Sequence, residues 1–323
     1  MNPQKTSPKP LVSVALTLAV LLVTAGVGAV WYLSATAPIH SSQAGPAAGA
    51  ESAALQLQSL ILRGAQLRDE GRYHQSKPLL GEALTLAERA FGPDSLEVAA
   101  VLNQLGMLGK YDGHFDEAEA AYRRALHIME ATASPTHPLT ATLLHNRGGL
   151  EHARGRFAEG EPYARRSVEL REQRFGPDHP DTAADVAALA ALLDGQGKYD
   201  EAEKLYRRAL DIFERVYGPE HYEVAVNLNN LAALCHATGR QEEAERLYSR
   251  ALAVKEKLLG KKHIDVAMTL NNLAVFYKSQ KRYSEAAALY RRALEIFEAV
   301  LDPTHPKLTT CRENYEQLLR AMN

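Results

Sequence analysis

The chain has 323 residues, of which 46% are hydrophobic and 24% are charged, a balance typical of folded rather than disordered proteins. Its 37 basic and 39 acidic residues give a formal net charge of −2. Because nucleic-acid-binding proteins carry a basic excess, this balance argues against that class. Two cysteines, Cys235 and Cys311, are too few for a disulfide scaffold or a cysteine-built zinc site. Aromatic residues make up only 7%, which favours helices over a β-sandwich or barrel.

The first feature along the chain is an uncharged apolar segment, residues 11–33. A helix of this length reaches roughly 35 Å, which is enough to cross the hydrocarbon core of a bilayer. Lys5 and Lys9 precede the segment, and the first charge after it is Glu51. Because positive residues favour the cytoplasmic side, we predict a cytoplasmic tail at residues 1–10 and a transmembrane signal-anchor helix at 11–33. The rest of this single-pass membrane protein would then be extracytoplasmic, in a periplasm or outside the cell.

A cleaved signal peptide is the alternative interpretation, and it would make the protein secreted. The apolar segment is longer than the roughly 7 to 15 residues of such peptides, and Pro38 follows the small-residue site at 35–37. Residues 34–52 are rich in Ala, Ser, Pro and Gly, a composition that predicts a flexible linker.

From residue 53 onward the sequence repeats every 42 residues. Four of the six units share an aromatic residue preceded two positions earlier by glycine, as in Gly113 and Phe115, whereas the fifth has Gly239 and Gln241 and the sixth has Lys281 and Tyr283. Within each unit, apolar residues fall at helical spacing in two blocks, separated by the glycine and ended by a longer connection. We therefore predict six antiparallel helix pairs within residues 53–304, and a capping helix at 305–323. The pairs are expected at about 53–90, 96–132, 138–174, 180–216, 222–258 and 264–300.

These residues resemble the tetratricopeptide repeat, a family whose pattern places small residues where this chain has Gly106, Gly113, Ala118 and Ala125. The 42-residue length and segments such as 218–221 and 228–232 resemble the kinesin light chain subclass. The resemblance covers roughly residues 53–323 and implies an all-α, right-handed solenoid of helix hairpins. It also implies a non-catalytic scaffold that binds an extended peptide or a partner helix in its concave groove.

In this resemblance, polar residues on the first helix of each pair form the implied peptide-binding surface. Asparagine suits this role because its amide both donates and accepts, and so can bind a peptide main chain. The alternative is that one asparagine of each pair bonds the neighbouring repeat and only stabilises stacking. Lys110 and Lys278 lie too many repeats apart for a lysine clamp on a terminal carboxylate. The candidates are Asn103, Gln104, Lys110, His145, Asn146, Asn229, Asn230, Asn271, Asn272 and Lys278.

Other residues also recur with the repeat. Histidines follow the 42-residue spacing at the repeat connections, and we expect a structural role for them. Metal ligands must converge to about 2 Å around one ion, whereas neighbouring repeats are roughly 10 Å apart. Glu119, Glu161 and Glu203 stand four residues before an arginine, which predicts ion pairs along a helix. Arg147 replaces a repeated leucine, and a buried arginine needs an acid or water. The histidines are His137, His179, His221, His263 and His305.

The sequence contains no nucleophile elbow, phosphate-binding loop or zinc-protease motif. We therefore expect no enzyme, no cofactor, no bound metal and no small-molecule substrate, and a protein or peptide as partner. Two other functions stay open. One is an assembly protein that oligomerises through exposed solenoid ends without a peptide ligand. The other is a soluble cytoplasmic adaptor whose N-terminal segment does not span a membrane.

Overall fold

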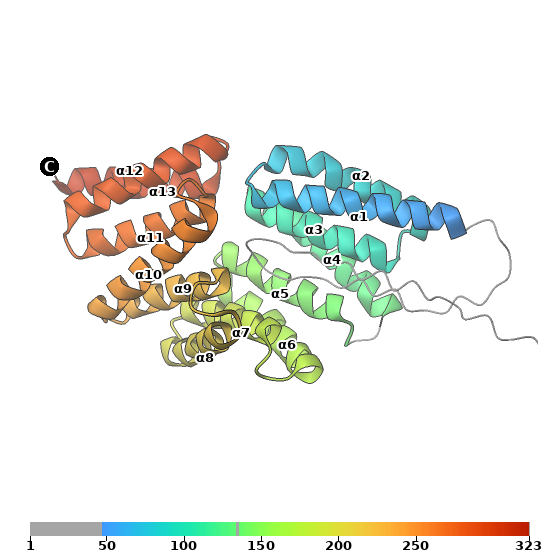
Figure 1. Ribbon diagram of the computed structural model, residues 1–323, viewed down its shortest axis with the longest axis horizontal. Helices are drawn as coiled ribbons and strands as arrows, with labels where there is room; N and C mark the ends of the chain where they lie inside the picture. Colours follow the sequence, from blue (N-terminus) through green and yellow to red (C-terminus); the bar gives the residue numbers. More distant parts are fainter. Residues whose placement is uncertain (1–46, 134–135, 323) are drawn as a thin grey trace, which may run out of the picture.

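The computed structural model describes residues 47–133 and 136–322, and within them the chain forms thirteen α-helices and no β-strand (Figure 1). Successive helices pair as antiparallel hairpins; the first helix of each pair is called helix A here and the second helix B. The A helices are α1 (Ala47–Asp69), α3 (Leu96–Asp112), α5 (Pro138–Ala153), α7 (Pro180–Gly195), α9 (Tyr222–Ala237), α11 (Ile264–Ser279) and the final α13 (Pro306–Met322). The B helices are α2 (Tyr73–Phe91), α4 (Phe115–Thr132), α6 (Phe157–Phe175), α8 (Tyr199–Tyr217), α10 (Gln241–Leu259) and α12 (Tyr283–Val300).

A small residue on helix A lets helix B approach closely within a hairpin. A Cβ atom added at Gly106 of α3 would lie 2.4 Å from the ring of Tyr122 in α4. Gly195 of α7 allows a similar approach between hairpins, because a Cβ atom there would lie 2.4 Å from Phe157 of the preceding α6. Tyr122 is fully buried, as are Tyr206 and Tyr290 at the same position of other repeats. The aromatic ring of one helix therefore fills the space that the missing side chain of the other leaves, which keeps the hairpin tightly packed.

The five repeated histidines begin the A helices. In each, Nδ1 accepts a hydrogen bond from the backbone N–H two residues later, at 3.1 to 3.3 Å. This bond satisfies one of the backbone donors that a helix start leaves without a partner. The recurring residues are thus helix caps: His137, His179, His221, His263 and His305.

A second repeated contact joins successive B helices. Arg208 of α8 pairs with Glu172 of α6 at 2.8 Å and donates to the carbonyl oxygen of Pro177 at 2.8 Å. Arg124, Arg250 and Arg292 make equivalent pairs of contacts with the preceding repeat. Of the ion pairs predicted along helices, Glu161–Arg165 and Glu203–Arg207 are formed.

The third predicted ion pair is wrong, because Glu119 turns instead toward the next repeat. Its carboxylate contacts Arg147 of α5 and Arg154, the residue that follows α5, both at 2.5 Å. Arg147 also pairs at 2.9 Å with Glu151, whose side chain is 1% exposed. The arginine that replaces a leucine in this repeat has thus gained acidic partners on two helices, which offsets the cost of burying its charge.

The N-terminal predictions fall largely outside the described residues. The predicted tail at 1–10, the anchor helix at 11–33 and linker residues 34–46 all lie there. Residues 47–52 were expected to belong to the linker but form the first part of α1, since alanine, abundant there, is the strongest helix former. Within residues 47–133 and 136–322, no helix is long and apolar enough to cross a membrane.

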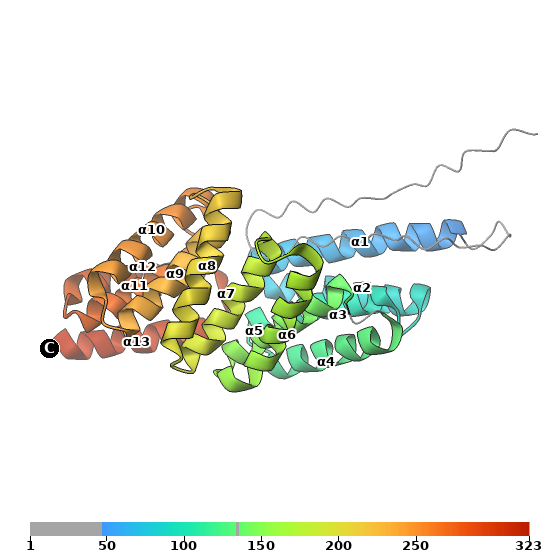
Figure 2. The ribbon, with the colours of Figure 1, turned by 90° about the horizontal axis from the view of Figure 1, so that it is seen from below.

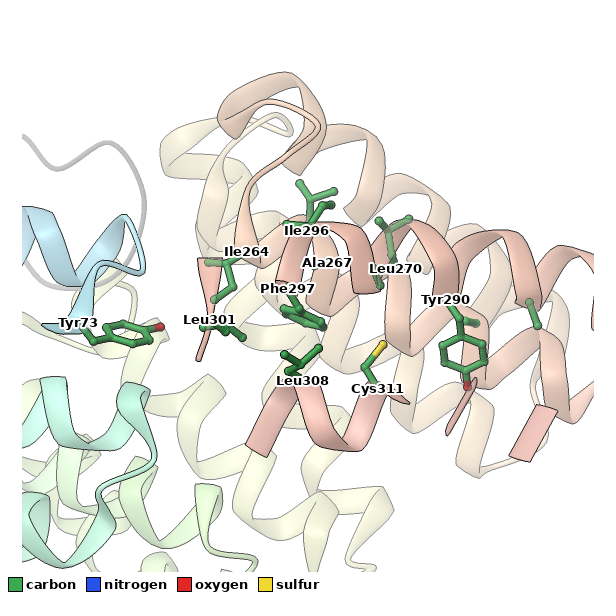
Figure 3. Close-up of a cluster of buried hydrophobic side chains, with 14 of the residues drawn as sticks. Tyr73, Ile264, Ala267, Leu270, Tyr290, Ile296, Phe297, Leu301, Leu308 and Cys311 are labelled. Carbon is green, nitrogen blue, oxygen red and sulfur yellow. The ribbon is translucent and has the colours of Figure 1, made fainter. Parts of the chain in front are cut away.

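The hairpins curve round until the first and last repeats touch (Figures 1 and 2). Tyr73, at the start of α2, belongs to the same buried cluster as Ile264, Leu301 and Leu308 (Figure 3). Its ring also stacks on the imidazole of His305, with centroids 6.1 Å apart. Repeats of a solenoid are expected to contact only their neighbours, so this closure is a feature that the repeat pattern did not predict.

Candidate functional site

The contact between the two ends of the array, called the seam here, joins helix ends of opposite polarity. α3 ends at Asp112, so the carbonyl of Tyr111 has no partner within its own helix. His305, which precedes α13, supplies one, because its Nε2 lies 2.8 Å from that carbonyl oxygen. The turn after α1 is equally close, since a Cβ atom added at Gly71 would lie 2.5 Å from Val300. The C-terminal ends of α1 and α3 therefore dock on the segment that enters α13.

Charged and phenolic groups surround the inner side of the seam. Two ammonium groups approach the ring of Tyr111: that of Lys110 lies 4.7 Å from its centroid, and that of Lys307 lies 5.5 Å away. Nearby, the hydroxyl of Tyr222 donates to a carboxylate oxygen of Asp265 at 2.8 Å. Burial raises the pKa of Tyr111 to about 12 and lowers the pKa of Lys110 to about 8. The site thus combines hydrogen-bond donors with a low-dielectric setting.

Two predicted asparagines in the N-terminal half are structural. Asn103 is 1% exposed and Asn146 is 6% exposed, and the Nδ2 of Asn146 donates to the Oδ1 of Asn103 at 2.8 Å. This bond joins α3 to α5 across the repeat boundary. The interpretation that these amides stabilise stacking therefore fits these two positions better than contact with a ligand.

The predicted asparagines of repeats five and six are only half-buried. Asn272 donates to Asn229 at 3.3 Å, and Asn229 donates to Asn230 at 3.4 Å. Asn314 of α13 extends the row by donating to Asn271 at 3.5 Å. Asn314 was missed as a candidate, although it follows Asn272 by one repeat length. These amides are joined across repeats as well, but each keeps a side open to solvent.

The remaining candidates make separate contacts. Gln104 accepts from Arg68 at 2.6 Å, and His145 contacts the buried Asp185 at 2.6 Å. Lys278 donates to Gln317 of α13 at 3.0 Å. Lys110, expected to be remote from any other groove lysine, meets Lys307 at Tyr111. Lys307 could not be recognised in the sequence, because only the closure of the array brings it to repeat two.

Comparison with known proteins identifies the family. Tetratricopeptide repeat models match residues 55–131, 139–214, 184–257 and 266–307. The chain belongs to the tetratricopeptide repeat family. Tetratricopeptide repeat proteins are generally non-catalytic scaffolds that bind protein partners. No curated protein matches the chain in sequence.

Two solved structures, those of BtubC and RapI, show the same fold at low sequence identity. BtubC (BKLC) from P. vanneervenii is 23% identical, with 77% of this chain and 94% of that chain covered and a TM-score of 0.50. The apo form of RapI is 13% identical, with coverages of 82% and 97% and a TM-score of 0.53. The repeats of a putative kinesin light chain from Podosopora anserina are 21% identical, with coverages of 62% and 96% and a TM-score of 0.48.

Proposed function

We propose that this tetratricopeptide repeat protein is a non-catalytic scaffold that holds an extended peptide or a partner helix against the A helices of repeats five and six. The observation that supports this is the half-buried state of the amides of Asn229, Asn230, Asn271 and Asn272. An asparagine amide offers two N–H donors and an oxygen that can accept twice. The bonds between these residues use only part of that capacity. The rest can bind a peptide main chain.

A photo-crosslinking experiment on the full chain tests this proposal. A crosslinkable residue at Asn271 should capture a partner in native membranes, whereas one at Lys204, exposed on α8, should not. The captured band should weaken when Asn229 is also replaced by alanine, because the ligand then loses one contact of the row. Equal capture from both positions would show that the A helices of these repeats have no special role.

We also propose that residues 11–33 anchor the scaffold in a membrane, with the repeats on the extracytoplasmic side. The support is the uncharged length of this segment and the position of Lys5 and Lys9 before it. Alkaline extraction of membranes should leave the full chain in the pellet, and protease added to sealed cells or spheroplasts should digest the repeats. Release into the supernatant would instead support the soluble adaptor or the cleaved, secreted form.

A second candidate function, assembly through the ends of the array, is favoured by exposed leucines. Leu55 on α1 is 53% exposed and Leu319 on α13 is 41% exposed. Apolar side chains at the open faces of terminal repeats are the kind of surface that joins one array to another. Light scattering on the full chain in detergent separates the two functions, because a monodisperse monomer would argue against assembly.

A further inference from the structure

Two lysines from opposite ends of the chain meet at the seam without an acidic partner. Lys110 lies in the last turn of α3 and Lys307 lies in the first turn of α13. Both ammonium groups lie against the ring of Tyr111. Among residues 47–133 and 136–322, neither forms an ion pair with a carboxylate. Most other arginines and lysines of the array pair with an acid of their own or a neighbouring repeat, as Lys77 does with Glu117 at 2.8 Å.

The charged groups nearest to these lysines offset their positive charges only in part. Arg68 adds another positive charge, and its guanidinium is already paired with Asp69 at 2.8 Å. The carboxylate of Asp265 accepts a hydrogen bond from the hydroxyl of Tyr222 and favours the charged form of Lys307 from a distance, without forming an ion pair with it. Lys307 also stands at the start of a helix, where the aligned peptide dipoles favour an anion and disfavour a cation. The seam therefore carries two ammonium groups that form no ion pair with a carboxylate of the described residues, and the charge of Lys110 has no nearby acid to offset it.

We propose that Lys110 and Lys307 together bind a dianionic oxyanion of the phosphate class, which bridges repeat two and the C-terminal helix. A dianion matches the two ammonium charges, whereas a single carboxylate would leave one unbalanced. Lysine binds phosphate as a compact point charge with three donors. Both side chains are half-buried rather than sealed, so an ion can reach them from solvent. The ion would hold the ends of the array together, and it is either free phosphate or a phosphoryl group on a partner.

The electrostatics of the seam support this proposal. Burial lowers the pKa of both lysines, that of Lys110 to about 8, while Asp265 opposes the lowering at Lys307. The nearby Lys307 and Arg68 add to the lowering at Lys110. A protonated lysine is thus costly here without an anion, and binding a dianion would restore the ordinary preference for the charged form.

Thermal unfolding and titration calorimetry of the full chain with inorganic phosphate test the proposal. Phosphate at 10 mM, on the order of a weak site's dissociation constant, is expected to raise the Tm relative to sodium chloride at equal ionic strength. Lys110→Gln and Lys307→Gln should each weaken phosphate binding at least tenfold. Lys204→Gln, an exposed lysine of α8 with no role at the seam, serves as the matched control and should bind as the unmodified chain does.

A second readout separates an ion site from a merely structural pair of lysines. Without phosphate, Lys110→Gln should leave the Tm unchanged or raise it, because it removes an uncompensated charge; a structural lysine would lower it. Phosphoserine distinguishes the sources: binding of phosphoserine but not of inorganic phosphate assigns the site to a phosphorylated partner, and binding of both assigns it to the phosphate group itself. The proposal is overturned if neither ligand binds, or if phosphate raises the Tm equally in both glutamine variants.

Discussion

His305 lies 2.8 Å from the carbonyl oxygen of Tyr111, a residue 194 positions earlier in the chain. Its two ring nitrogens serve both ends of the array: Nδ1 accepts from the N–H of Lys307 and so caps α13, while Nε2 donates to the last turn of α3. The neutral tautomer with its proton on Nε2 satisfies both bonds at once. His305 thus caps a helix as the other repeated histidines do, and in addition it joins the two ends of the array.

The contact between the first and last repeats should be lost when an apolar side chain of the seam is removed. Tyr73 packs against Leu301 and His305 and is 6% exposed. Tyr73→Ala is expected to cost up to about 3–5 kcal/mol of local packing and to increase the radius of gyration in small-angle X-ray scattering. Tyr199, at the same repeat position but 37% exposed, provides the control: Tyr199→Ala should leave the scattering profile unchanged. Identical profiles for both variants would show that the seam does not hold in solution.

The seam should also weaken in acid. Burial lowers the pKa of His305, so the unfolded chain binds this proton more readily than the folded one. The stabilisation from His305 is therefore fully present above its usual pKa of about 6.5 and is lost as the pH falls through the lower folded-state value. Nearby Asp112 and Asp302 oppose the lowering and Lys307 adds to it.

This effect is best measured as the difference in unfolding free energy between the unmodified chain and His305→Asn. Asparagine keeps a neutral cap that does not titrate, and the difference cancels other groups such as Asp194, whose pKa burial raises to about 6. The difference should be largest above pH 7, on the order of 1 kcal/mol, and should shrink by pH 5. A difference that grows in acid would mean that the seam prefers the charged imidazole.

The hairpins could be predicted from the sequence because local contacts specify them. Gly106 beneath Tyr122 and the histidine caps belong to single hairpins or helix starts, so their pattern repeats wherever the structure does. Contact between the two ends of the array depends instead on the small rotation of each repeat relative to the next, added over all repeats. The sequence of a single repeat does not determine this sum. Tyr73 and Tyr199 occupy the same register, yet one is buried at the seam and the other is exposed.

The candidate site likewise has features that the repeat pattern predicts and others that depend on the folded array. Asn103 and Asn229 share a register, but Asn103 is buried against Asn146 whereas Asn229 keeps an exposed side. The sequence predicted the polar row and could not say which of its amides solvent reaches. Lys307 belongs to no recurring pattern, and its meeting with Lys110 follows only from closure of the ring.

The ion network of the third repeat offers a further test. Arg147→Leu restores the residue found at Leu189 and Leu231 but leaves the buried Glu151 with only Arg154, 3.7 Å away, as an ion-pair partner. We expect this change to lower the unfolding free energy by about 3–5 kcal/mol. Arg147→Leu combined with Glu151→Leu should recover most of that loss, because an apolar pair replaces a buried ion pair. A double-mutant cycle in urea measures the coupling, and additive losses would contradict this explanation.

A substitution at one backbone position should stabilise the protein. Lys281 has a φ of 59°, where five other repeats have glycine, and this left-handed conformation costs a side-chain-bearing residue about 1–2 kcal/mol. Lys281→Gly is expected to raise the unfolding free energy by up to about 1 kcal/mol after the added chain entropy is subtracted. Gly239→Lys, in a position where an added Cβ meets nothing within 4 Å, should lower it by a similar amount. Unchanged Tm values for both would mean that the turn relaxes freely.

The two halves of the asparagine row should respond differently to alanine. Asn103→Ala removes the acceptor of a buried bond and leaves the Nδ2 of Asn146 without its partner, a loss of about 1–3 kcal/mol in stability. Asn229→Ala with Asn271→Ala removes bonds of half-buried amides, whose partners can turn to water. The Tm of this double variant should therefore change little, while affinity for a captured partner falls about tenfold or more, since one net hydrogen bond contributes about 1 kcal/mol. Thermal unfolding and a binding titration on the same samples separate the two quantities. If stability and binding fall together in the double variant, these asparagines also belong to the packing between repeats, and the ligand must bind elsewhere on the ring.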